Sequence, residues 1–134
     1  MQISLLHLQI IGILLIILAS VHVVFPRYFH WKEVLKPLPL LERQIFYVHT
    51  FFVALTVLGM GILSLVRTES LINTPLGRDI CLTIGIFWLL RLLFQLFVYS
   101  PKLWREKTME STVHVIFTIL WTYLTTAFLI IAFS

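Results

Sequence analysis

Charged residues and cysteine are both scarce in this sequence. Only 12% of the 134 residues are charged, and Cys81 is the single cysteine. A soluble domain of this length keeps about a quarter of its residues charged, because its surface faces water. One cysteine also excludes a disulfide within the chain. The composition therefore argues against an ordinary soluble domain.

Several motifs of known enzyme classes are missing as well. The sequence has no phosphate-binding glycine-rich loop, no nucleotide motif and no nucleophile–base–acid arrangement, which argues against kinase or hydrolase chemistry. No helix-spaced His-x-x-x-His or Glu-x-x-His pair occurs, so the di-iron signature of helix bundles is absent. The net charge of +4 comes from basic residues in short loops between apolar runs, which indicates membrane orientation and no nucleic-acid partner.

Hydrophobic residues, by contrast, make up 60% of the chain and are gathered in four long runs. Each run has about 20 residues or more, enough to cross a hydrocarbon layer of about 30 Å. The sequence predicts an all-α, four-helix transmembrane bundle that forms one domain over residues 1–134. The start of the chain lacks the basic region of a signal peptide, so we expect the first run to be a retained helix. The predicted helices cover about residues 3–25, 44–66, 80–99 and 112–133.

The distribution of basic residues predicts the orientation in the membrane. The first and third loops hold seven Lys and Arg residues, the second loop holds two and the two tails hold none. Because cytoplasmic loops are enriched in Lys and Arg, we expect those two loops in the cytoplasm and both termini outside. The protein would then be a multi-pass protein of the cytoplasmic membrane. The segment from Arg27 to Lys32 interleaves aromatic and basic residues, which is typical of chain in the headgroup layer.

Polar side chains inside the predicted spans are the most informative feature. Such residues cost a few kcal/mol near the bilayer centre and usually face the bundle interior. Counted from the basic loops, His22, His49, His114 and Gln95 lie about 6–10 Å inside the cytoplasmic boundary. Arg91 lies about one helical turn deeper. All four helices are therefore predicted to bring a polar group to one cytoplasmic-side layer.

Helical spacing places these groups on shared faces. The predicted face of the third helix holds Ile84, Trp88, Arg91, Gln95 and Tyr99. The predicted face of the fourth helix holds His114, Thr118, Trp121, Thr122 and Thr125. On the second helix a strip of small residues, suited to close packing, contains Thr50, Ala54 and Gly61.

Three interpretations compete for His22, His49 and His114. They are interhelical hydrogen-bonding residues, ligands of a haem or a transition metal ion, or members of a proton relay. In the ligand hypothesis two or three of these histidines hold haem b or the metal, and the role is redox chemistry or electron transfer. Arg91 and Gln95 would orient or neutralise the bound group, with Tyr47 as a nearby hydrogen-bonding residue. The propionates of a haem could reach residues from the set Arg91, Arg27 and Arg43.

Short motifs on the first two helices also suggest a family. Leu41-Glu42-Arg43, followed by Tyr47, Val57, Gly59 and Gly61, resembles the HemJ-type protoporphyrinogen oxidases, as do Leu6-His7 and Pro26-Arg27-Tyr28-Phe29. Members of that family are small four-helix membrane proteins that bind a b-type haem and act late in haem synthesis. The similarity covers less than half of the chain. It implies haem b and an oxidoreductase activity, with His7 and not the inner histidines as the candidate ligand.

Two alternatives to a cofactor protein remain open at this point. The first is a non-enzymatic accessory or assembly subunit, whose polar residues hold helices together in a larger membrane complex. The second is a small proton-coupled transporter, which would form homo-oligomers. In each case the lipid bilayer is the main partner.

Overall fold

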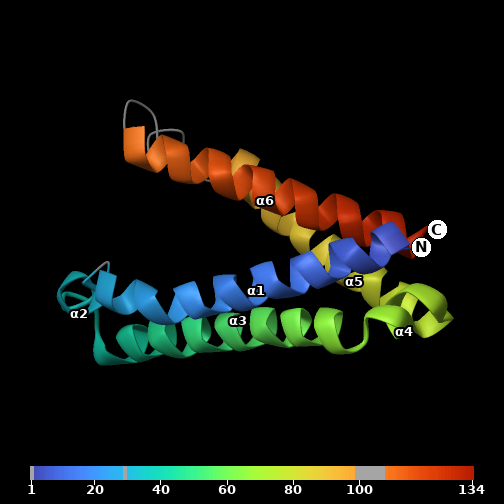
Figure 1. Ribbon diagram of the computed structural model, residues 1–134. Coiled ribbons are helices and arrows are strands. Elements are labelled where there is room, and N and C mark those ends of the chain that lie inside the picture. The colour runs from blue at the N-terminus through green and yellow to red at the C-terminus, as the bar shows by residue number, and fades with distance from the viewer. Residues whose placement is uncertain (1, 29, 99–107) are drawn as a thin grey trace. The chain divides into compact units, whose positions relative to one another are not determined.

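The computed structural model describes residues 2–28, 30–98 and 108–134, and all regular elements in these ranges are helices (Figure 1). Four of them are long and apolar enough to cross a membrane, which confirms the prediction of an all-α chain with four such helices. The elements are α1 (Gln2–Tyr28), α2 (Trp31–Val34), α3 (Leu40–Val66), α4 (Thr68–Asn73), α5 (Pro75–Leu93), the π-helix η1 (Phe94–Val98) and α6 (Thr108–Ala132).

The chain divides into two compact units. The α1–α3 unit consists of Leu8–Thr68, and the α5–α6 unit consists of Met1–His7 together with Glu69–Ser134. Both units expose large apolar side chains, among them Phe51 and Ile119. Water would not favour such surfaces, whereas lipid does. The exposure agrees with helices that cross a membrane.

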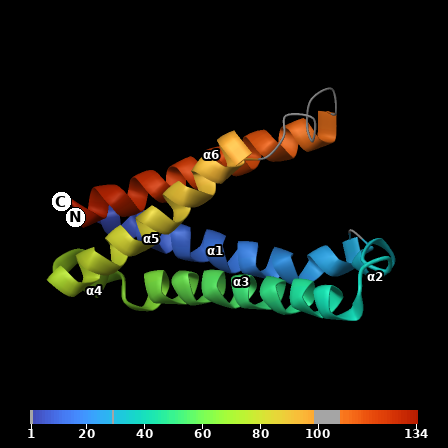
Figure 2. The same cartoon turned by 180° about the vertical axis from the view of Figure 1, so that it is seen from behind.

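In the α1–α3 unit the two long helices run antiparallel and side by side (Figures 1 and 2). Their backbones lie close together at Gly12 and Gly61, where a Cβ atom on Gly61 would lie only 2.9 Å from the Gly12 carbonyl oxygen. Small residues allow two helices to approach this closely, as predicted for the strip of small residues on this helix. Ala54, another residue of that strip, is also buried. Gly59, by contrast, has no atom within 4 Å of where its Cβ would be.

In the α5–α6 unit aromatic side chains form the centre of the packing between α5 and α6. Trp88, with 2% of its surface exposed, stacks on Trp121 with ring centroids 5.0 Å apart. Gln95 and Thr125 are buried in the same unit, so the predicted inward faces are confirmed at these positions. Thr122 is exposed, contrary to prediction, because it lies one step beyond the face that Trp121 and Thr125 share. Tyr99 lies outside the described residues.

The ends of the helices differ from the predicted ends. α1 runs to Tyr28, past the predicted stop at residue 25, because a proline in the last turn removes only one hydrogen bond from a long helix. α3 begins at Leu40 instead of residue 44, directly after its N-cap Pro39. α5 begins at Pro75 instead of residue 80, since proline suits the first helical turn. α6 covers Thr108–Ala132 instead of residues 112–133.

Candidate functional site

His22 and His49 line one hollow of about 440 Å³ in the α1–α3 unit. We call it the histidine hollow. α3 supplies most of it, because steps of three and four residues put Glu42, Phe46, His49 and Val53 on one face. The complete lining is His22, Trp31, Glu42, Ile45, Phe46, His49, Thr50 and Val53. Two imidazoles and a carboxylate therefore meet walls that are otherwise almost entirely apolar.

The tautomer of His22 follows from its hydrogen bond. Its Nδ1 atom lies 2.8 Å from the carbonyl oxygen of Leu18, one turn earlier in α1. A carbonyl oxygen can only accept, so Nδ1 carries the ring proton and donates it. In the neutral ring, Nε2 then holds the lone pair. Histidines that bind metals through Nε2 usually donate Nδ1–H to a carbonyl or carboxylate in this way.

Trp31 separates the histidine hollow from two other predicted site residues. Its ring packs against Phe46, at 4.6 Å between centroids, and against Tyr47, at 5.8 Å. Tyr47 and Arg43 line a different hollow, which shares only Trp31 with the histidine hollow. The structure thus brings His22 and His49 together and puts Tyr47 on the other side of Trp31.

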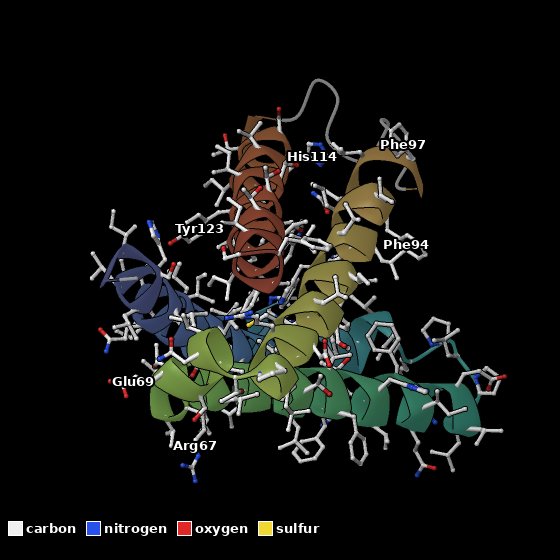
Figure 3. All side chains as sticks on the ribbon, turned by 90° about the vertical axis from the view of Figure 1, so that its right-hand side faces the viewer. Arg67, Glu69, Phe94, Phe97, His114 and Tyr123 are labelled. Carbon is white, nitrogen blue, oxygen red and sulfur yellow. The ribbon has the colours of Figure 1, made fainter. Side chains whose placement is uncertain are left out.

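Gln95 and His114 are brought together in the α5–α6 unit. Gln95 belongs to η1, and its Nε2 atom lies 2.8 Å from Nδ1 of His114 and 3.5 Å from the carbonyl oxygen of that residue. In Figure 3 His114 lies on the side of α6 that faces α5. Because an amide nitrogen only donates, Nδ1 of the neutral imidazole accepts and Nε2 carries the proton. This tautomer is the opposite of that of His22, and a role of His114 as a ligand stays a prediction.

Arg91 contacts the aromatic centre of the same unit. Its guanidinium carbon lies 5.3 Å from the centre of the Trp121 ring, within range of a cation–π interaction. The same ring also stacks on Trp88 and on Phe117, with ring centroids 5.0 Å and 5.4 Å apart. Sequence reasoning put Arg91 and Trp121 on inward faces but did not predict that they interact.

A contact that the sequence did not indicate joins His7 to Tyr123. Nδ1 of His7 and the Tyr123 hydroxyl lie 2.7 Å apart, and the two rings meet edge to face. Both residues line a hollow of about 290 Å³ together with Ser4 and Thr126. Tyr123 projects from α6 in Figure 3. The two partners are 116 positions apart, and no periodicity in one sequence relates residues at that separation.

The predicted site residues therefore form two groups, one in each unit. His22 and His49 belong to the α1–α3 unit, and Arg91, Gln95 and His114 belong to the α5–α6 unit. The common depth in the membrane relates residues of both units, and it stays a prediction. Within residues 2–28, 30–98 and 108–134, no group of three or more His, Cys, Asp and Glu side chains is arranged to hold a metal ion.

Comparisons of the chain with protein-family models, with characterised proteins and with solved structures give no match. The similarity to the HemJ-type oxidases, with His7 as a haem ligand, therefore stays a prediction.

Proposed function

We propose that the protein is a multi-pass membrane redox protein that binds haem b, or else a transition metal ion, in the histidine hollow. His22 and His49 would be the ligands. The observation that carries the proposal is that His22 and His49 line one hollow with mostly apolar walls, in which the Nδ1–H of His22 donates to the Leu18 carbonyl as it does in many metal-binding histidines.

The composition of the hollow favours haem over a bare ion. Haem iron requires only one or two histidines, whereas zinc sites take three or four protein ligands. Phe46, Val53 and Trp31 offer apolar contact to a macrocycle, and about 440 Å³ is within the usual range for small-ligand sites. When bound, haem would supply one-electron chemistry. The chain would hold the iron through His22 and His49, and these apolar walls would contact the macrocycle.

Absorption spectroscopy and metal analysis of the purified full-length protein test this proposal. We expect a Soret band, or failing that a stoichiometric transition metal. His22→Ala and His49→Ala should each lower the cofactor content about tenfold or more, since a ligand is lost. His114→Ala is the matched control, because its ring proton lies on Nε2 and its hydrogen bonds are made in the other unit. Protein that contains neither haem nor metal after expression with both supplied would refute the proposal.

The Gln95–His114 contact favours a second candidate function for the α5–α6 unit. A hydrogen-bonded pair between membrane helices is what a non-enzymatic assembly subunit uses to hold its helices together. Purification in mild detergent separates the two functions. A stable larger complex, in which His114→Ala lowers the unfolding temperature and His22→Ala has no effect on any bound cofactor, would favour the assembly role.

We also propose the orientation in the cytoplasmic membrane that the loop charges favour, with both termini outside. The loops next to α2 and before α6 hold most of the Lys and Arg residues, and the loop around α4 holds only Arg67 and Arg78. An alkaline phosphatase fused to the C-terminus should then be active, because it folds outside the cytoplasm, whereas a fusion after Lys36 should be inactive. The reverse pattern would contradict this orientation.

A further inference from the structure

A second hollow, of about 180 Å³, lies at the start of α3 and carries two cations. We call it the basic hollow. Its polar lining comes from Lys32, Arg43 and Gln44, and its walls come from Trp31, Leu35, Leu40 and Tyr47. None of the described residues that line it is acidic. Glu42, the acidic residue next to Arg43, lines the histidine hollow instead.

Arg43, one of the residues that line this hollow, has a side-chain donor without a partner among the described residues. Its Nε atom is buried and has no hydrogen-bond partner among the described residues. A guanidinium carries five N–H donors in a rigid planar fork, which matches carboxylate or phosphate oxygens. An anion held by this fork would form charge-assisted hydrogen bonds with the Arg43 side chain.

The loop that carries Lys32 is held in place by packing. α2 follows His30, whose backbone is in the left-handed region at φ 52°, and its C-cap Leu35 is only 6% exposed. The Trp31 ring rests on Phe46 and Tyr47 of α3. Lys32 is therefore kept near the first turns of α3, and the hollow is built from fixed elements.

We propose that the basic hollow binds the phosphate group of an anionic phospholipid. The hollow lies where the apolar span Leu40–Val66 begins, which is where headgroups meet the hydrocarbon layer. Lys32 and Arg43 would contact the phosphate, and Leu35 and Leu40 would meet the glycerol and the first methylenes. Trp31 and Tyr47 are the residue types that membrane proteins place at this depth. Basic sites beside membrane helices bind anionic lipids in the same way.

Native mass spectrometry of the full-length protein tests the proposal. The protein is released from detergent containing equal amounts of dioleoyl phosphatidylglycerol and dioleoyl phosphatidylcholine, which differ in headgroup and charge. We expect phosphatidylglycerol to be retained preferentially. Lys32→Gln and Arg43→Gln should each lower its retention about fivefold, and Arg43→Lys should restore part of it. Lys36→Gln is the matched control, because Lys36 belongs to the same loop and does not line the hollow.

Two further measurements separate the lipid from other anions and from misfolding. Inorganic phosphate added at a large excess should leave lipid retention unchanged, and its displacement of the lipid would identify a free-phosphate site and overturn the proposal. Circular dichroism shows whether the Arg43 variants fold, and the exposed Lys32 provides a variant that leaves the packing intact. Equal retention of both lipids by the wild type, or retention unaffected by Lys32→Gln, would also overturn it.

Discussion

The close contact between α1 and α3 predicts that alanine at Gly61 destabilises the protein while alanine at Gly59 does not. A Cβ on Gly61 would lie 2.9 Å from the Gly12 carbonyl oxygen, 3.0 Å from Ile16 Cγ1 and 3.1 Å from Leu15 Cβ. The oxygen belongs to the backbone, so the helices would have to move apart. Overpacking of this kind costs about 1–3 kcal/mol.

Gly59 is a control on the same helix, two residues away, with no atom within 4 Å of its Cβ position. Both substitutions gain the same helix propensity, roughly 1 kcal/mol, so this gain cancels in the comparison. We therefore expect Gly61→Ala to have a free energy of unfolding about 1–3 kcal/mol below that of Gly59→Ala. Titration of the purified protein in detergent with a denaturing surfactant measures both. Equal stability of the two variants would refute the close approach of α1 and α3.

Three further substitutions test the α5–α6 unit. Gly77→Ala should lower the free energy of unfolding by roughly 2–4 kcal/mol, because its Cβ would overlap the backbone of α4, and surfactant titration measures the loss. Gln95→Leu removes the amide donor to His114 Nδ1 and should lower the free energy of unfolding by about 1–3 kcal/mol in the same assay. An unchanged free energy of unfolding would contradict a stabilising role of that hydrogen bond. Tyr123→Phe removes the hydrogen bond to His7 and should speed hydrogen exchange of the first residues of α1, while rates equal to those of the wild type would contradict its role.

The helices of this chain could be predicted well, and their ends could not. Long apolar runs are sufficient for a membrane span, so all four were found from composition alone. Their starts depend on caps. Thr74 accepts a hydrogen bond from the Gly77 amide at 2.9 Å and thereby starts α5 at Pro75, before the apolar run begins. Pro39 is the N-cap of α3 but makes no side-chain hydrogen bond to it, and it lies within a segment that the sequence predicts as a turn.

The candidate site was predictable as far as helical periodicity reaches. Spacing along the helix predicted that Trp88 and Gln95 face inward, and both are buried. Which side chains then meet depends on how two helices are rotated against each other, and one sequence does not contain that information. The position of Arg91 over the Trp121 ring and the pairing of His7 with Tyr123 both belong to this class. The separation of Tyr47 from the histidines by Trp31 belongs to it as well.

The predicted common depth in the membrane does not make the histidines chemically equivalent. The Nδ1–H of His22 is satisfied by the carbonyl of Leu18 on its own helix, so α1 alone sets the tautomer of this histidine. The tautomer of His114 is set by Gln95 on another element, and it changes if α5 and α6 shift against each other. The ring orientation of His22 is therefore fixed within α1, whereas the tautomer of His114 depends on how α5 and α6 pack. This difference is the reason to look for the proposed cofactor in the histidine hollow and to treat the Gln95–His114 contact as part of the structure that holds α5 and α6 together.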